Sequence, residues 1–332
     1  MMSNSPILVL GSNSFSGASF CSHLIKQGLE VIAASRSLEP NEALLPYKWH
    51  KNLDLVTFHQ LDLNHHLDEI MSLIKQHKVR YIYNFAAQSM VGQSWQHPEH
   101  WFMTNTVSTV QFHNALRQYD GLEKYIHIST PEVYGSCSGL VTESTSYHPS
   151  TPYAVSRAAA DMSLHTFNEV YDFPVVFTRA ANVFGEGQQL YRIIPKTIYS
   201  VLNNETFPLH GGGHSTRSFI HMDDVSHATQ LIGEQGNTGD IYHISTSENI
   251  TVRALVMRIC EMLNTPFEQV CHVSEDRLGK DAAYLLDNTK LKSELGWQSQ
   301  VSLDNGLDRT IGWAKNKLDV LKTLPKEYVH KP

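Results

Sequence analysis

Short runs of apolar, β-branched residues alternate along the first half of the chain with longer amphipathic stretches. The apolar runs predict strands at residues 6–10, 30–34, 55–61, 81–86, 124–128 and 174–178. The amphipathic stretches predict helices such as 15–27, which Gly28 closes, and 107–119. Strands that alternate with helices of this length form βαβ units, so the sequence predicts an α/β fold with a doubly wound parallel sheet.

The alternation breaks down after Gly185, which predicts a second, smaller α/β unit. Residues 218–221 and 240–244 look like strands that return to the main sheet. We therefore assign residues 1–185 plus about 217–248 to the larger domain, and 186–216 plus about 249–332 to the smaller one. Because no linker rich in Pro, Gly or Ser separates them, we expect the chain to cross between the domains more than once.

Composition narrows the class of protein. The 332 residues include 26 Lys+Arg and 33 Asp+Glu, a net charge of −7, without the clustered basic footprint that nucleic-acid binding requires. With 41% apolar residues the chain is too apolar to be disordered. No apolar run approaches the roughly 20 residues that span a bilayer, and no charged leader precedes the first strand. We expect a soluble, cytoplasmic protein without membrane or nucleic-acid partners.

The cysteines and histidines do not indicate a metal site. The 4 cysteines contain no C-x-x-C pair, and we expect them to be free thiols. The 19 histidines are scattered, and no pair, including His65 and His66, has the spacing of a known zinc motif. We therefore predict no bound metal.

The turn after the first predicted strand has the features of a dinucleotide site. It reads Gly-Ser-Asn-Ser-Phe-Ser-Gly over residues 11–17, with serine where the usual pattern has its middle glycine. Glycine lets the backbone approach a pyrophosphate, which the free N–H groups and dipole of the following helix attract. The residues that we expect to bind it are Gly11, Asn13, Ser14, Phe15, Ser16 and Gly17.

The end of the second predicted strand indicates which dinucleotide is bound. A fold that prefers NAD carries an acidic residue there to bind the ribose 2′-hydroxyl, whereas this chain has Ser35, Arg36 and Ser37. Because an arginine flanked by hydroxyls suits a 2′-phosphate, we expect NADP; NAD stays the alternative if Arg36 is simply solvated. Asp62 and Leu63, after the third strand, are placed to meet the adenine.

A tyrosine and an arginine open the helix predicted after residue 150. Tyr153 and Arg157 are four residues apart, so they lie on one helical face, and the cation should lower the pKa of the phenol. A phenolate can take the proton of a substrate alcohol while hydride leaves the same carbon for a nicotinamide. Thr130, at the end of an earlier strand, could hydrogen-bond that alcohol oxygen.

These residues carry a resemblance to a known family. The chain resembles the extended short-chain dehydrogenase/reductases and, within them, the nucleotide-sugar 4,6-dehydratases such as those acting on dTDP-glucose and GDP-mannose. The resemblance covers nearly the whole length and implies a Rossmann-type fold with a nucleotide-sugar-binding C-terminal domain. Besides the glycine turn, it rests on residues 84–89, 104–106, 129–135, 151–153, 179–185, 217–224, 276–281 and 294–297.

The resemblance implies a lyase that makes a 4-keto-6-deoxy sugar nucleotide. Its cofactor oxidises the sugar at C4, a base removes the C5 proton, water leaves from C6, and hydride returns to C6. Glu132 matches the base, and a proton α to a ketone does require a nearby carboxylate. Two alternatives stay open, namely a nucleotide-sugar epimerase of the same family and an NADP-binding protein that has lost turnover.

The resemblance also implies further site residues and a homodimer. Arginines bind phosphate in bidentate fashion, which fits an anionic substrate. The substrate-binding residues implied are Ser89, Thr130, Asn182, Arg192, Arg217, Arg277 and Lys280, and the additional cofactor-binding residues are Ala86, Ala87, Asn105, Tyr153 and Arg157.

Three positions depart from the family pattern. Arg157 stands where the family has lysine; it keeps the charge but cannot release a proton in a relay. Pro131 stands where the dTDP-glucose enzymes have the aspartate that protonates the departing C6 hydroxyl, and Met90 replaces a histidine in the pocket wall.

Overall fold

A seven-stranded parallel sheet forms the centre of the protein. The computed structural model describes residues 5–137, 139–275 and 285–331. The strands run in the order β3-β2-β1-β4-β5-β7-β11, and every neighbouring pair is parallel. Their bounds are β1 (Ile7–Leu10), β2 (Val31–Ser35), β3 (Val56–Gln60), β4 (Tyr81–Asn84), β5 (Lys124–Ile128), β7 (Val175–Ala180) and β11 (Ile241–Ile244). The doubly wound fold predicted from the alternating pattern is confirmed.

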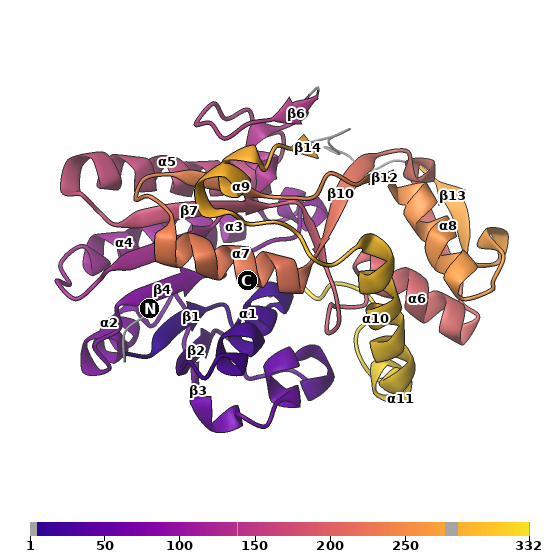
Figure 1. The fold of residues 1–332 in the computed structure, drawn as a ribbon, viewed down its shortest axis with the longest axis horizontal. Helices are drawn as coiled ribbons and strands as arrows, with labels where there is room; N and C mark the ends of the chain where they lie inside the picture. Colours follow the sequence, from indigo (N-terminus) through magenta and orange to yellow (C-terminus); the bar gives the residue numbers. More distant parts are fainter. Residues whose placement is uncertain (1–4, 138, 276–284, 332) are drawn as a thin grey trace.

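Helices cover both faces of this sheet (Figure 1). On one face α1 (Phe15–Lys26), α7 (Met222–Gln235) and α9 (Thr289–Leu295) share a core with the sheet. On the other face lie α2 (Leu67–Gln76), α4 (Thr109–Leu116) and α5 (Pro152–Tyr171). Because both faces are covered, β1 and β2 are buried throughout. Their residues are apolar except for Ser35 at the end of β2.

A second group of helices and short strands lies beside the carboxyl ends of the main sheet (Figure 1). It contains α6 (Ile193–Asn203), α8 (Val252–Met262), α10 (Leu303–Asn316) and α11 (Leu318–Leu321) around a separate apolar core. The parallel pair β9 (Phe207–His210) and β13 (Cys271–Ser274) packs on α8. These elements lie in the segments that the sequence assigns to the smaller domain.

One strand prediction is correct and one is wrong in its partner. Residues 240–244 join the main sheet as β11, which pairs with β7, as predicted. Residues 218–221 do form a strand, β10 (Thr216–His221), but it pairs with β8 (Asn182–Phe184) and β12 (Asn249–Thr251) in a separate sheet. Because β11 already occupies the free edge of β7, the main sheet offers β10 no place there.

The division at about residue 249 is less sharp in space than in sequence. Helix α9 follows that boundary, yet it packs against β11, and Leu291 lies in the core of the main sheet. The short strand β14 (Leu285–Leu286) pairs with β6 (Leu140–Val141) of the larger part. The domain boundaries themselves stay a prediction. Among the described residues, no helix is both long and apolar enough to cross a membrane.

The helix predicted at 107–119 begins earlier and is irregular. Helix α3 (Pro98–Phe102) runs into a π-helical stretch (Met103–Ser108) and then into α4. The hydroxyl of Thr109 donates to the carbonyl of Thr104, five residues back, at 2.9 Å. Asn105, whose side chain is buried, lies in this stretch.

A buried ion pair joins α5 to the strands beside it. Asp161 on α5 and Arg179 on β7 are fully buried and lie 2.8 Å apart. The same carboxylate accepts a hydrogen bond from Ser129 at 2.6 Å, and its other oxygen lies 3.3 Å from Nε2 of His127 on β5. Burial raises the pKa of Asp161, but the hydrogen bond with His127 and the charge of Arg179 outweigh it and hold the pKa below the usual range.

We predict that Asp161→Asn lowers the free energy of unfolding by about 3–5 kcal/mol, because the buried guanidinium of Arg179 loses its counter-charge. Urea denaturation followed by circular dichroism measures the change. Asp308→Asn on the exposed side of α10 is the control and should stay within about 0.5 kcal/mol. Equal stability of the two variants would show that the pair does not hold α5 in place.

Candidate active site

A cavity of about 1100 Å³ lies at the carboxyl ends of the central strands and extends to β10 and α6. Most of the predicted site residues line it, from both parts of the chain. From the larger part these are Gly11, Asn13, Ser14, Phe15, Ser16, Ser35, Arg36, Asp62, Leu63, Ala86, Ala87, Ser89, Thr130, Glu132, Tyr153, Arg157 and Asn182. Arg192, just before α6, and Arg217, on β10, also line it.

The glycine turn brings three backbone segments into close contact. Gly11 has φ +78°, and a Cβ there would lie 2.6 Å from the backbone nitrogen of Ala86. Gly17 does not line the cavity; a Cβ on it would lie 2.3 Å from the carbonyl oxygen of Gly11. The two glycines therefore let the end of β1, the start of α1 and the loop after β4 pack together, which keeps the N-terminus of α1 open to the cavity.

Ser14 caps the helix at the position where a glycine is usual. Its hydroxyl accepts a hydrogen bond from the backbone nitrogen of Gly17 at 3.0 Å, which satisfies one of the free donors of α1. Asn13 ties the turn to the end of β2, because its side chain donates to the carbonyls of Ser37 and Leu38 at 2.8 and 3.1 Å. The polar residues of the turn thus have structural roles alongside the predicted contact with cofactor.

The end of β2 meets the C-terminal segment. Arg36 lines the cavity, and its guanidinium donates to the carbonyl of Lys331 at 3.2 Å. The ammonium of Lys331 lies 3.1 Å from the hydroxyl of Ser37, so two cationic side chains lie beside the end of β2. Asp62 faces the cavity from the next strand end, where its carboxylate accepts from the backbone nitrogen of Asn64 at 2.9 Å.

Asn105 lies behind the cavity rather than in its wall. It is fully buried, its amide donates to the carbonyl of Gln88 at 3.0 Å and to the hydroxyl of Ser156 at 2.9 Å, and its oxygen accepts from the backbone nitrogen of Gln88 at 2.8 Å. It therefore fixes the loop 86–89 against α5. Because that loop carries Ala86, Ala87 and Ser89, Asn105 positions cavity-lining residues without lining the cavity itself.

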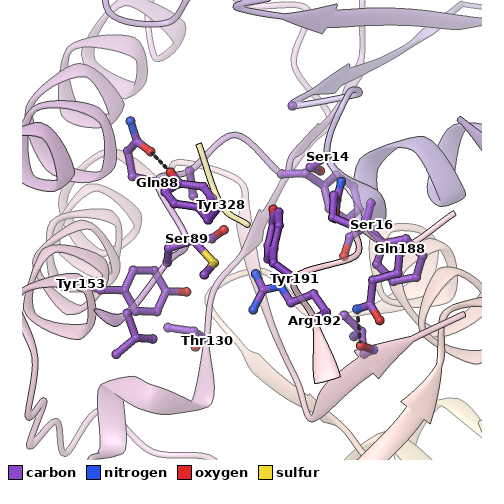
Figure 2. Close-up of a pocket in the computed structure, with 18 of the residues that line it drawn as sticks. Ser14, Ser16, Gln88, Ser89, Thr130, Tyr153, Gln188, Tyr191, Arg192 and Tyr328 are labelled. Atoms are coloured by element: carbon purple, nitrogen blue, oxygen red, sulfur yellow. Dashed lines mark hydrogen bonds between the residues drawn. The ribbon is translucent and has the colours of Figure 1, made fainter. Parts of the chain in front are cut away.

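Thr130 and Glu132 lie at the carboxyl end of β5. Thr130 caps the short 3-10 helix Pro131–Tyr134, and its hydroxyl accepts from the backbone nitrogen of Glu132 at 3.3 Å. Pro131 occupies the first position of this helix, where its missing N–H has no partner to lose. Figure 2 shows Thr130, Ser89 and the hydroxyl of Tyr153 on one side of the cavity, with Arg192 across from them.

The expectation that Tyr153 has a lowered pKa is wrong for its net shift. Burial raises the pKa of Tyr153, and the nearby charge of Glu132 raises it further. Arg157 lowers the pKa, as the sequence predicts, and so does the hydrogen bond with Thr130, but neither offsets the loss of water around the phenol. The sequence pattern identified the cation correctly and could not weigh it against burial.

Arg157 turns its guanidinium toward β5. The side chain is 3% exposed, donates to the carbonyl of Ile128 and lies 3.3 Å from Nε2 of His127. Since His127 also contacts Asp161, the buried ion pair behind the site extends to Arg157. A guanidinium held in this way acts on Tyr153 as a fixed charge.

The proposed anion-binding residues are described in part. Arg217 on β10 is buried and donates to the carbonyl of Thr216 at 2.8 Å, and Asn182 begins β8 beside it. Arg192 directly precedes α6 and contacts the ring of Tyr191. Arg277 and Lys280 lie outside the described residues. The two described arginines and Asn182 therefore share the cavity with Tyr153 and Glu132.

Sequence reasoning missed several residues of the cavity wall. Gln188 donates to the carbonyl of Val183 at 2.9 Å, and Tyr328 lies 3.4 Å from the side-chain oxygen of Gln88 (Figure 2). Gln88 belongs to the segment 84–89 that carries the resemblance, so it could have been named. The C-terminal residues Tyr328 and Lys331 follow no motif, and only the folded chain brings them to the cavity.

Comparisons with known proteins agree with this architecture. The family described as "GDP-mannose 4,6 dehydratase" matches residues 8–310. The chain belongs to this family. It is 30% identical to the dTDP-glucose 4,6-dehydratase of Xanthomonas campestris pv. campestris (strain B100) over 337 residues, 92% of each chain. The resemblance to nucleotide-sugar 4,6-dehydratases seen in the sequence is confirmed.

Solved structures share the fold of this chain. The crystal structure of the dTDP-glucose 4,6-dehydratase of Streptomyces venezuelae, with NAD bound, has a TM-score of 0.88 and 29% identity, covering 95% of this chain and 98% of that one. The UDP-glucose 4-epimerase of Thermotoga maritima has a TM-score of 0.85 and 26% identity, covering 94% and 99%. This chain therefore shares its architecture with dehydratases and epimerases alike.

We predict that Arg157→Met moves the rising limb of the pH profile of kcat/KM to higher pH. The charge of Arg157 lowers the pKa of Tyr153, so its removal raises that pKa further. Each unit of upward shift reduces the phenolate fraction at pH 7 about tenfold. Arg157→Lys is the control, since it keeps the charge and should keep most of the wild-type profile. Identical profiles for all three proteins would show that Arg157 does not act on Tyr153.

Proposed function

We propose that this member of the GDP-mannose 4,6-dehydratase family is a lyase that converts a nucleoside-diphosphate sugar into its 4-keto-6-deoxy derivative. The observation that carries the proposal is the meeting of Tyr153, Thr130 and Glu132 in one cavity with the glycine turn and two arginines. An epimerase needs the tyrosine and the cofactor, but loss of water requires a base for the C5 proton. Glu132 is the carboxylate that lines the cavity in the turn after β5.

The described residues fit a nicotinamide dinucleotide. The N-terminus of α1, which the close packing at Gly11 leaves beside the cavity, suits a pyrophosphate. We assign Asp62 and Leu63 to the adenine and Ala86 and Ala87 to cofactor binding, since all four line the cavity. When bound, the nicotinamide would accept a hydride from C4 of the sugar and return it to C6. A nicotinamide bound in this cavity would share it with Tyr153 and Arg157.

The side chains then divide the proton transfers. Tyr153 takes the proton of the C4 hydroxyl while Thr130 hydrogen-bonds the same oxygen. The C4 ketone makes the C5 proton acidic, and the carboxylate of Glu132 removes it. Arg192 and Arg217 bind the diphosphate of the substrate, with Asn182 beside them. Of these residues, Arg192 lies in the segment assigned to the substrate-binding domain, whereas Asn182 and Arg217 lie at the edges of the segments assigned to the cofactor-binding domain.

Departure of the C6 hydroxyl requires a proton, and Pro131 cannot supply it. Once Glu132 has taken the C5 proton, it is itself an acid beside the sugar. We assign the protonation of the leaving hydroxyl to Glu132, so that one carboxylate moves the proton from C5 to the departing water. The atoms balance, because the C5 proton and the C6 hydroxide leave together as water.

The substrate class is tested by incubating the protein with dTDP-glucose, GDP-mannose, UDP-glucose, UDP-N-acetylglucosamine and CDP-glucose, and by measuring product mass. Loss of one water from any of them supports the dehydratase, and dTDP-glucose is the first choice because relatives carry that name. An unchanged mass with altered stereochemistry would instead identify an epimerase.

The proposed homodimer is supported by the exposed apolar side chains of Val155, Met162 and Val170 on α5.

We predict that Glu132→Gln lowers the rate of dehydration by about 10²–10⁴-fold, the usual contribution of a general base. Oxidation at C4 should persist, so that reduced cofactor accumulates and absorbs near 340 nm. Mass spectrometry of the product and absorbance of the enzyme measure the two steps. Glu169→Gln, exposed at the end of α5, is the control. Unimpaired loss of water in Glu132→Gln would exclude Glu132 as the base.

The choice between NAD and NADP is a separate question. NAD is bound in the solved neighbours, which favours NAD for this chain. The end of β2 favours NADP, because Arg36 and Lys331 supply two cations where a 2′-phosphate would lie. If NADP is the cofactor, we predict that Arg36→Ala weakens its binding by about 10- to 100-fold, the loss of a charge-assisted hydrogen bond, and leaves NAD binding unchanged. Calorimetry with each dinucleotide measures both values; tighter binding of NAD to the wild type would refute the expectation of NADP.

A further inference from the structure

Three histidines and a glutamate gather at the surface where α3 begins. The histidine cluster consists of His97, Glu99, His100 and His330. One ligand atom each from His97, Glu99 and His100 lie within 4.8 Å of one another. His330 joins from the C-terminal segment, with its Nε2 2.8 Å from Nδ1 of His100. The fold thus collects four side chains that offer nitrogen or oxygen ligands.

Local structure explains how the cluster forms. His97 directly precedes α3, and Pro98 is the first residue of this helix, so His97, Glu99 and His100 share its first turn. Trp101 is fully buried and stacks on His330, with ring centroids 5.0 Å apart and an angle of 11°. His97 and Glu99 are more than half exposed, and His100 is 29% exposed. An ion can therefore reach the cluster from solvent.

His330 belongs to a segment that contacts the active-site cavity. The carbonyl of Lys331, the next residue, accepts from the side chain of Gln88 at 2.7 Å and from Arg36 at 3.2 Å. Tyr328, two residues before His330, lies against Gln88 (Figure 2) and lines the cavity. A bond that holds His330 in place therefore also holds residues 326–331 against the cavity wall.

We propose that the histidine cluster binds one divalent transition-metal ion of the zinc class and that this ion fastens residues 326–331 to α3. Neutral imidazole nitrogens and a carboxylate oxygen are a donor set that zinc accepts, with bonds of about 2.0–2.2 Å in tetrahedral geometry. The same set disfavours Mg²⁺ and Ca²⁺, which prefer oxygen. The proposal requires neither cofactor nor sugar and is independent of the proposed function.

Binding requires the histidine rings to rearrange. The rings of His97 and His100 are stacked at 21°, and those of His100 and His330 at 14°, so their lone pairs do not converge. Tetrahedral bonds of about 2.05 Å place donors about 3.3 Å apart, closer than the 4.8 Å spread of the cluster. Binding therefore requires the imidazole rings to rotate about χ2, which is a broad torsion in histidine.

The site could not be predicted from the sequence, because one of its four ligands, His330, is far from the other three in the chain. His97, Glu99 and His100 form no known zinc spacing by themselves. His330 lies 230 positions after His100 and reaches it only through the packing of the C-terminal segment on Trp101. The expectation of no bound metal was based on spacing alone, and the fold supplies what spacing does not.

The proposal is tested by titrating Zn²⁺ into the untagged protein after it has been dialysed against a chelator. Calorimetry should find one Zn²⁺ per chain with a dissociation constant in the micromolar range or below, unaffected by excess Mg²⁺. His330→Ala and His100→Ala should each weaken binding at least tenfold. His272→Ala, an exposed histidine on β13, is the matched control and should bind as the wild type does. Circular dichroism checks that all variants are folded.

Tryptic cleavage after Lys326, followed by mass spectrometry, measures the fastening itself. Zn²⁺ should slow the loss of residues 327–332 at least tenfold in the wild type and not in His330→Ala. The absence of stoichiometric binding would overturn the proposal, and so would equal affinity of the wild type and His330→Ala. Binding without slower cleavage would refute the role of the ion in holding the segment.

Discussion

The carboxylate of Asp161 is buried where α5 meets β5 and β7, and the position of the candidate catalytic groups depends on it. A buried charge is tolerated only when it is paired, and Arg179, His127 and Ser129 supply partners from both strands. Asp161 lies four residues after Arg157 and eight after Tyr153 on one face of α5. The interactions that satisfy this carboxylate therefore fix Tyr153 relative to Thr130, the second residue after β5.

The sequence predicted those features that depend on local pattern. Alternating apolar runs gave the parallel sheet, and because parallel strands end at one edge, the segments after β1, β2 and β5 could be brought to one cavity. The pattern could not show what depends on distant contacts. The pairing of β10 with β8, the place of Asn105 behind the loop 86–89 and the approach of Lys331 to Arg36 all follow from packing.

The local distribution of charge, and not the net charge, determines which anionic ligands this chain can bind. A net charge of −7 disfavours partners that are recognised through extended phosphate backbones, yet the cavity of the same chain gathers Arg36, Arg192 and Arg217. Helix N-termini add donors without adding charge, as the first turn of α1 does beside Gly11. A polyanionic ligand can thus be bound by an acidic protein, provided that its cations line one cavity.

Pro131 and Arg157 affect the same part of the proposed reaction, the transfer of protons. Proline removes a side-chain acid from the turn after β5, and arginine replaces a lysine that could release a proton. The overall reaction takes one proton from the C4 hydroxyl and places one on C5 after water has left. Tyr153 must therefore give up a proton in each turnover, and Arg157 cannot carry it. The family pattern divides these proton transfers among a tyrosine, a lysine, an aspartate and a glutamate. In this chain they fall to Tyr153 and Glu132, and the charge of Glu132 acts on Tyr153.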